Sequence, residues 1–108
     1  MFCGIVSREV PATILHEDDA VLAFKDLSPR APFHALVIPK VHVASLAEAT
    51  DPETVGRVVL VAAALAKAAG YGDSGFRVVS NAGPDAGQTV GHLHFHVLAG
   101  RRQTWPPG

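Results

Sequence analysis

Apolar segments separated by short polar breaks run along much of the chain and predict most of its strands. The segments "ATILHED" and "AVLAFKD" flank the acidic residues 17–19, a pattern that predicts two antiparallel strands joined by a polar turn. The segment 34–40, "HALVIPK", is rich in Val, Ile and Leu and is bounded by prolines, so it predicts a third strand. The segment 76–81, "FRVVSN", predicts a fourth strand.

Between the third and fourth strands the pattern changes to helical spacing. Asp51 is suited to an N-cap, Pro52 to the first helical position, and Glu53 complements the helix dipole. Apolar residues then recur at intervals of three or four: Val55, Val59, Ala62 and Ala66. Gly70 and Gly72 follow and are expected to end the helix.

The last apolar segment, "GHLHFHVLAG" at 91–100, predicts a fifth strand with an unusual polar face. His92, His94 and His96 occupy alternate positions, with Leu93 and Phe95 between them. Because side chains alternate across a strand, the histidines are expected on one face, about 7 Å apart, and the apolar residues on the other.

The predicted order is a hairpin, a strand, a long helix, a strand, a loop and the histidine strand. Grouped strands with one dominant helix indicate an α+β fold. We expect a mostly antiparallel five-stranded sheet with one long helix and a short N-terminal helical segment. At 108 residues the whole chain, 1–108, is expected to form a single domain.

Composition narrows the class of protein. Hydrophobic residues make up 48% of the chain and the net charge is −1, which excludes a disordered tail and a strongly basic nucleic-acid binder. Cys3 is the only cysteine, so no internal disulfide can form and a reducing compartment is expected. The N-terminal segment is a poor signal peptide, and the longest apolar stretch, 58–66, is too short to span a bilayer. These features predict a soluble cytoplasmic protein without nucleic-acid or membrane partners.

Three interpretations of the three histidines are open from the residues alone. They could form an ordinary solvated face, although histidine is a scarce choice for one. They could hold a metal ion, because His-x-His on a strand can bind zinc, with His34 and His42 as candidates for further ligands. They could act on phosphorus, with one neutral imidazole as nucleophile and another binding the phosphate oxygens. The Gly-rich loop 81–92, whose backbone N–H groups could converge on an anion, favours the third interpretation.

Several segments together resemble a known family. "HLHFHVL" matches the histidine triad signature, in which three histidines alternate with apolar residues. The segments 26–43, "DLSPRAPFHALVIPKVHV", and 78–101, "VVSNAGPDAGQTVGHLHFHVLAGR", with the terminal "WPPG", resemble the Hint branch of that family. The resemblance covers nearly the whole chain. It implies a hydrolase of purine nucleoside phosphoramidates, such as adenosine 5′-monophosphoramidate, that needs no metal or other cofactor.

The resemblance also implies a role for each histidine. The middle one, His94, corresponds to the nucleophile that attacks the α-phosphate and forms a nucleotidyl-histidine intermediate. His96 corresponds to the residue that contacts the phosphate, and His92 and His34 correspond to residues that orient the nucleophile. We expect the second ring nitrogen of His94 to donate a hydrogen bond to a backbone carbonyl, which would hold the lone pair of the first toward phosphorus.

Further positions match the nucleotide-binding site of the branch. Asp26 matches the carboxylate that accepts both ribose hydroxyls. The resemblance implies that four residues line the phosphate and leaving-group side: Asn81, Gly87, Gln88 and Thr89. It implies that four apolar residues sandwich the base: Phe2, Ile5, Phe24 and Leu36. From the residues alone, Asp26 could instead be a turn or cap residue, and the four apolar residues could be ordinary core.

The chain departs from the family pattern in two places. Thr89 stands where the branch usually has Ser, which keeps the hydroxyl but adds a methyl group beside the leaving amine. Some bacterial relatives hold zinc with a Cys-x-x-Cys pair and two histidines. Here Cys3, His42 and His92 match three of those ligands, and the first cysteine has no match. This incomplete set predicts weak metal binding at most.

The resemblance further implies a homodimer. The helix carries apolar residues on more than one face, as at 58–61, and the C-terminal segment with Trp105 is expected to reach the partner. Two other functions stay open. One is a dinucleoside polyphosphate hydrolase of the same superfamily, and the other is a nucleotide-binding scaffold in which hydrolysis is incidental.

Overall fold

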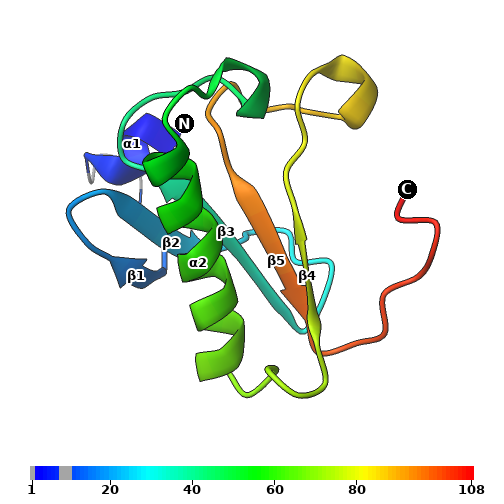
Figure 1. The fold of residues 1–108 in the computed structure, drawn as a ribbon. Helices are drawn as coiled ribbons and strands as arrows, with labels where there is room; N and C mark the ends of the chain where they lie inside the picture. The colour runs from blue at the N-terminus through cyan, green and yellow to red at the C-terminus, as the bar shows by residue number, and fades with distance from the viewer. Residues whose placement is uncertain (1, 8–10) are drawn as a thin grey trace.

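The computed structural model describes residues 2–7 and 11–108, which form an α+β fold (Figure 1). The predicted fold class and order of elements are confirmed. Within these residues the α-helices are α1 (Phe2–Val6) and α2 (Pro52–Ala68), and the strands are β1 (Ile14–Glu17), β2 (Val21–Lys25), β3 (Phe33–Pro39), β4 (Phe76–Val79) and β5 (Phe95–Ala99). Short 3-10 helices, η1 (Leu46–Glu48) and η2 (Pro84–Ala86), lie in the loops after β3 and β4.

The sheet is antiparallel throughout, with the strand order β1-β2-β3-β5-β4. β1, β2 and β3 form a meander, whereas β5, the last strand in sequence, lies between β3 and β4. The register pairs His34 with Leu98 and Leu36 with His96 on the two neighbouring strands. Because directly paired residues point to the same face, this register brings His34 and His96 together on one side of the sheet.

α2 covers one face of the sheet (Figure 1). Its start follows the predicted signals: the Asp51 side chain accepts a hydrogen bond from the Glu53 N–H, and Pro52 takes the first helical position. Small side chains one turn apart form its buried stripe: Val58, Ala62 and Ala66. They let the helix axis lie close to the strands. No helix in the described part of the chain is long and apolar enough to cross a membrane.

The buried stripe of α2 differs by one position from the predicted one. The sequence pattern places Val59 in the core, but the structure leaves this side chain 37% exposed and buries Val58 completely. The run 58–61 is apolar all around the helix, so periodicity alone cannot choose between neighbouring residues. Packing against the sheet decides, and it leaves Leu60 72% exposed as well.

The opposite face of the sheet carries a second apolar cluster, which α1 joins. Phe2 and Ile5 of α1 are both buried there. The strands contribute four side chains: Leu22, Phe24, Leu36 and Ile38. Since Leu36 pairs with His96, the histidines of β3 and β5 lie on this same face. The fold therefore sets imidazole rings beside an apolar floor.

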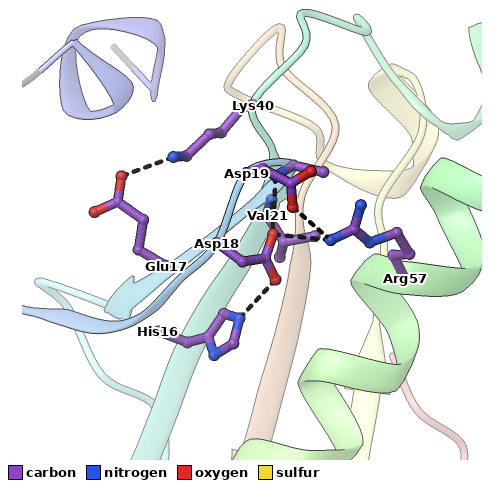
Figure 2. A network of polar contacts seen from close by, with 8 residues as sticks. His16, Glu17, Asp18, Asp19, Val21, Lys40 and Arg57 are labelled. Atoms are coloured by element: carbon purple, nitrogen blue, oxygen red, sulfur yellow. Dashed lines mark hydrogen bonds and ion pairs between the residues drawn. The ribbon is translucent and has the colours of Figure 1, made fainter.

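The turn between β1 and β2 is held by polar and charged side chains that we call the hairpin-tip network (Figure 2): His16, Glu17, Asp18, Asp19, Lys40 and Arg57. One carboxylate oxygen of Asp18 accepts the N–H groups of Ala20 and Val21, both at 2.8 Å. Its other oxygen lies 2.9 Å from Nε2 of His16. Arg57 of α2 contacts Asp18 at 3.2 Å and Asp19 at 2.9 Å. The network thus ties the hairpin to the long helix.

Candidate active site

A cavity of about 430 Å³ opens on the face of the sheet opposite α2. It draws its walls from α1, β2, β3, β5 and the loop that precedes β5. The structure brings most of the predicted site residues to this one place: Phe2, Ile5, Phe24, Asp26, Leu36, Asn81, Gly87, Thr89, His94 and His96. Gln88, His34 and His92 do not line it, and each has a different position, described below.

The cavity has an apolar end next to a polar end. Phe2 stands edge-on to Phe24, with ring centroids 5.5 Å apart, and edge-on to the His94 ring at 5.0 Å. Phe2, Ile5 and Phe24 are buried, so they belong both to the core and to the cavity wall. The two interpretations of these apolar residues therefore do not exclude each other. A flat apolar ring suits this end, and an anion with hydrogen-bond acceptors suits the imidazole end.

His94 is held with one ring nitrogen available to the cavity. Its Nδ1 lies 2.7 Å from the carbonyl oxygen of His92. A carbonyl can only accept, so Nδ1 carries the proton and Nε2 keeps its lone pair. The predicted backbone acceptor is confirmed. The Ser80 hydroxyl donates to the His94 carbonyl at 2.9 Å, and the Leu93 N–H donates to the Val43 carbonyl at 2.6 Å, so the backbone on either side of the ring is also fixed.

The three histidines do not form the predicted row. β5 begins at Phe95, and residues 92–94 lack strand structure, so the alternation rule does not extend to His92. The His92 ring is buried and donates from Nε2 to the Pro39 carbonyl at 3.0 Å. His94 and His96 do line the cavity together, with ring centroids 5.1 Å apart. His92 acts on the site through its carbonyl and not through its ring.

A chain of hydrogen bonds fixes which nitrogen of His96 carries a proton. The backbone N–H of Arg30 donates to Nδ1 of His34 at 3.0 Å, so the His34 proton must lie on Nε2. That nitrogen lies 2.9 Å from Nδ1 of His96 and donates to it. Nδ1 of His96 is therefore the acceptor, and the neutral ring carries its proton on Nε2. His96 thus offers the cavity a donor, whereas His94 offers a lone pair.

Both members of this chain are held neutral. The pKa of His96 is lowered to about 4, first by burial and then by the rings of His94 and His34, against the opposing effect of the Asp26 carboxylate. Burial likewise lowers the pKa of His34, and Asp26 partly offsets that effect. At neutral pH, two uncharged rings can therefore share a hydrogen bond without like-charge repulsion.

Asp26 serves as a turn residue and as part of the cavity wall. One carboxylate oxygen accepts the Ser28 N–H at 2.7 Å, which is the turn role considered from sequence. The other oxygen lies 3.3 Å from Nε2 of His34 and 3.9 Å from Nδ1 of His96. A carboxylate oxygen has two lone pairs, so acceptor capacity remains toward the cavity. The sequence alternatives for Asp26 therefore coexist.

Two glycine N–H groups of the Gly-rich loop, those of Gly83 and Gly87, are engaged within the loop, whereas convergence of the remaining loop N–H groups on an anion stays a prediction. Gly83 and Gly87 adopt positive φ values of 85° and 79°, so the loop closes on itself. The Gly87 N–H bonds to the Pro84 carbonyl, and the Gln88 N–H to the Gly83 carbonyl. The Gly83 N–H bonds to the Gln88 side chain at 2.8 Å. Of this loop, Thr89 carries the hydroxyl that lines the cavity.

Gln88 is a structural residue of the loop and does not line the cavity. Its side-chain oxygen accepts the Gly83 N–H, and its Nε2 donates to the carbonyls of Ala44 and Val90 at 2.8 and 2.9 Å. Its amide is fully engaged with backbone groups. The expectation that Gln88 contacts the phosphate side is therefore replaced by a role in holding the loop that carries Thr89.

Cys3, His42 and His92 come together behind the cavity. The Cys3 Sγ lies 3.3 Å from Nδ1 of His42 and 3.5 Å from Nδ1 of His92. These three ligand atoms all lie within 4.8 Å of one another. Since Nε2 of His92 donates to Pro39, its Nδ1 keeps a lone pair facing the sulfur. The three residues fit a partial tetrahedral metal site, as the sequence match indicates, and weak binding stays a prediction.

Some residues that line the cavity carry no catalytic signal in the sequence. They are Pro11, Ala12, Lys25, Leu27, Ser28 and Val90. Leu27 is 84% exposed, which is unusual for leucine, and it directly follows Asp26. Val90 is an isolated apolar residue inside the Gly-rich loop. In the sequence, Leu27 directly follows Asp26 and Val90 directly follows Thr89. An apolar residue beside a predicted site residue is the signal that could have identified these two.

Comparisons with known proteins find a matching family model, similar sequences and a similar solved structure. A family model described as the HIT domain matches residues 7–103. An uncharacterized HIT-like protein of Synechococcus elongatus is 49% identical over 110 aligned positions, covering all of this chain and 96% of that protein. A 14 kDa zinc-binding protein of Brassica juncea is 45% identical and is matched over 98% of its length. The crystal structure of a HIT family hydrolase from Legionella pneumophila is 44% identical, with a TM-score of 0.97 over all of this chain and 98% of that one.

Proposed function

Because the chain belongs to the HIT domain family, we propose that it hydrolyses the P–N bond of purine nucleoside 5′-phosphoramidates, as the Hint branch does. Its fold is the nucleotide-binding fold of HIT family hydrolases. One observation carries the proposal. Nε2 of His94 keeps a lone pair on the cavity wall, beside a second imidazole that donates a proton to the same space. Nucleophile and oxyanion donor are therefore adjacent.

In the first step, Nε2 of His94 attacks the α-phosphorus in line with the leaving nitrogen. An Nε2–P bond forms as the P–N bond breaks, and the nitrogen leaves with the bonding electrons and takes up a proton from solvent. The His94 ring becomes positively charged, and the His92 carbonyl 2.7 Å from Nδ1 stabilises that charge. The same contact keeps the ring from turning away from phosphorus.

Two groups act on the atoms around phosphorus during this step. Nε2–H of His96 donates to a phosphate oxygen, and the low pKa of this ring keeps it a neutral donor across the physiological range. Thr89 lines the same cavity, which supports assigning its hydroxyl to a contact with the leaving nitrogen. Its extra methyl group, compared with Ser, narrows the space for bulky amines.

In the second step, a water molecule attacks phosphorus and the Nε2–P bond breaks, which returns His94 to its neutral form. The products are one nucleoside monophosphate and one amine for each water consumed. No metal takes part, because imidazole and hydroxyl donors supply the charge stabilisation. The purine lies between the four apolar residues of the cavity, and the remaining acceptor capacity of Asp26 serves the ribose hydroxyls.

We also propose that the protein is a two-fold homodimer. Leu60 and Val59 are 72% and 37% exposed on α2, and β4 is an edge strand of the sheet. Trp105, 82% exposed in the single chain, is available to reach a second copy. Light scattering is expected to give the mass of a dimer. A monomer at micromolar concentration would count against this arrangement.

The test is a comparison of leaving groups on one nucleoside. Adenosine 5′-monophosphoramidate and diadenosine tetraphosphate are incubated with the protein, and the products are followed by phosphorus NMR. The proposal expects AMP from the phosphoramidate at a rate far above that from the polyphosphate, and a rapidly quenched reaction should carry AMP on His94. Faster cleavage of the polyphosphate would instead assign a dinucleoside polyphosphate hydrolase, and binding without turnover would assign a nucleotide-binding scaffold.

A further inference from the structure

A second hollow, of about 330 Å³, lies beside the candidate active site and is strongly basic. Three arginines from different segments line it: Arg30 before β3, Arg77 of β4 and Arg101 after β5. No Asp or Glu is among the described residues of its wall. Figure 1 shows the C-terminal segment running past the β4 edge of the sheet. Gln103 and Thr104 of this segment line the hollow.

Among the described residues, the hydrogen-bond acceptors of the Arg77 and Arg101 side chains are backbone carbonyls. Arg77 donates to the Thr104 carbonyl at 2.9 Å, and Nε of Arg101 donates to the Arg30 carbonyl at 2.9 Å. Carbonyls use some N–H groups but carry no charge, and a guanidinium has five. Within the described residues, none of the three arginines forms an ion pair, unlike Arg57 with its two aspartates. The hollow therefore keeps positive charge and free donors.

A neighbouring hollow shows that this charge is not general around the site. This neighbouring hollow, of about 370 Å³, is lined by Thr89 and is separate from the arginine-lined hollow. Its described lining contains Glu48 and no Lys or Arg. Of these two hollows beside the active-site cavity, the arginine-lined one suits an anion, because its positive charge attracts negative groups and the Glu48 hollow does not.

The arginine-lined hollow shares walls with the active-site cavity. Asn81 and His96 line both spaces, and His34, which sets the tautomer of His96, lines the hollow. A phosphate held by His96 therefore lies at the boundary between the two. A group attached to that phosphate can extend past the His96 ring toward the arginines without crossing the apolar end of the cavity.

We propose that the arginine-lined hollow is a subsite for an oxyanion on the leaving part of the substrate, a carboxylate or phosphate a few bonds beyond the scissile nitrogen. This inference rests on the proposed function and names its substrate class: nucleoside phosphoramidates of acidic amines, such as amino acids. The P–N bond breaks as before, the amine leaves with the bonding electrons and one proton, and its oxyanion is unchanged. Arginine suits this role because its planar fork binds both oxyanions in two-point fashion.

The test compares four adenosine 5′-phosphoramidates that differ only in the amine: ammonia, glycine, glycinamide and phosphoethanolamine. Glycine and glycinamide have nearly the same shape and differ in charge. The glycine or the phosphoethanolamine compound is expected to exceed the glycinamide compound about tenfold in kcat/KM, a ratio typical of one charge-assisted contact. Which of the two acidic compounds is preferred identifies the oxyanion. Equal values for glycinamide and for both acidic compounds would overturn the proposal.

Variants that remove one arginine charge test whether a preference for acidic amines arises from this hollow. Arg77→Gln and Arg101→Gln each keep an N–H donor for the backbone carbonyl but remove the charge. Each is expected to lower kcat/KM for the preferred acidic compound severalfold and to leave that for glycinamide unchanged. Arg102→Gln is the matched control, because Arg102 is a neighbouring exposed arginine that does not line the hollow. An equal loss in the control would show a general charge effect and contradict the subsite.

Failure of the subsite can be separated from failure of the proposed function. Turnover of the ammonia compound without any acidic preference would overturn the subsite alone. If no phosphoramidate is hydrolysed, the proposed function fails, and calorimetry with the His94→Ala variant still compares affinity for the glycine and glycinamide compounds. Tighter binding of the glycine compound that weakens as salt increases would support the hollow as an oxyanion site. Equal affinity would contradict it.

Discussion

Two polar clusters in this protein contain histidine next to aspartate, and they are built in opposite ways. In the active site, His34 is buried, His96 and Asp26 are partly buried, and burial is the main reason that the pKa values of the two rings are lowered and the rings stay neutral. In the hairpin-tip network, His16 and Asp18 are partly exposed, and the Asp18 carboxylate contacts both His16 and Arg57 of α2 (Figure 2). The same pair of residue types therefore performs different work, because the surroundings differ.

The difference lies in what each cluster gains from hydrogen bonds. At the hairpin tip, the Asp18 carboxylate stays charged, because its pKa is lowered chiefly by the His16 contact, then by the Ala20 and Val21 N–H groups and the Arg57 charge. Exposed ion pairs of this kind contribute little to stability and fix a local turn. In the active site, the hydrogen bonds fix which nitrogen carries a proton, and this decides the chemical role of each ring. Exposure therefore separates a structural cluster from a reactive one.

The largest expected effect is loss of turnover in His94→Ala. Removing the nucleophile should lower kcat by at least about 10³-fold, because the remaining groups can bind but cannot form the covalent intermediate. Steady-state assays with adenosine 5′-monophosphoramidate measure it. His16→Ala is the control from the other cluster and should keep near-normal kcat. Turnover of the His94 variant close to that of the unchanged protein would refute the nucleophile assignment.

The second prediction is a difference in acid stability between the clusters. Burial depresses the pKa of His96 from an unfolded value near 6.5 to about 4. Below pH 6.5 the unfolded chain therefore takes up protons that the folded chain does not. The free energy of unfolding should fall as pH decreases from 6.5 to about 4, by roughly 3 kcal/mol from His96 alone.

The hairpin-tip network should respond in a lower pH range. The depressed pKa of Asp18 stabilises the fold above the unfolded value of 3.8, and that contribution is lost only as pH falls further. Urea unfolding at a series of pH values measures both phases. His96→Gln should reduce the upper phase, to which His34 and His92 also contribute because burial lowers their pKa values too, and Asp18→Asn should reduce the lower phase. Constant stability between pH 7 and 4.5 would contradict the buried neutral imidazoles.

The third prediction concerns His34 as a positioning residue. His34→Leu removes the donor to Nδ1 of His96, so His96 is free to adopt the other tautomer, and kcat should fall about 10- to 100-fold. His34→Gln keeps an N–H donor and should recover part of the loss. Nitrogen NMR of the His96 ring reports the tautomer directly. An unchanged tautomer in His34→Leu would refute the relay.

The smallest expected effect is that of Arg57→Gln. This change removes the ion pairs to Asp18 and Asp19 but leaves the Ala20 and Val21 hydrogen bonds. The free energy of unfolding should drop only slightly, because exposed ion pairs contribute little, and the difference should shrink in high salt. Thermal unfolding at two salt concentrations measures it, while kcat serves as the control. A large drop in kcat would mean that the two clusters are coupled.

Much of the fold could be predicted because local signals agree with packing. The polar turn at 17–19, the caps at Asp51 and Pro52 and the apolar strands all correspond to elements of the structure. The choice between Val58 and Val59 could not be predicted, since it depends on how the helix rotates against the sheet. The start of β5 at Phe95 could not be predicted either, because the tertiary hydrogen bond from Leu93 to Val43 interrupts the strand.

For the site, the sequence predicted residue types better than their partners. The motif and the family resemblance predicted a shared site for His94, His96, Asp26 and Thr89, and the structure places all four in the lining of one cavity. The roles of Gln88 and of the loop glycines depend on hydrogen bonds within the loop, which spacing does not reveal. The Arg30 N–H donates to Nδ1 of His34, and this bond sets the tautomer of His96. It joins a turn to a strand and leaves no sequence pattern.

The position of β5 between β3 and β4 has a consequence for biosynthesis. During synthesis, β3 and β4 leave the ribosome before β5, which lies between them in the sheet. Until β5 pairs with both, the backbone groups on the facing edges of β3 and β4 lack their partners. The β3 edge cannot be completed by local contacts, because its pairing with β5 joins distant parts of the chain. Since that same strand brings His96, and the segment just before it brings His94, a nascent polypeptide acquires its reactive imidazoles only with the insertion that completes the sheet.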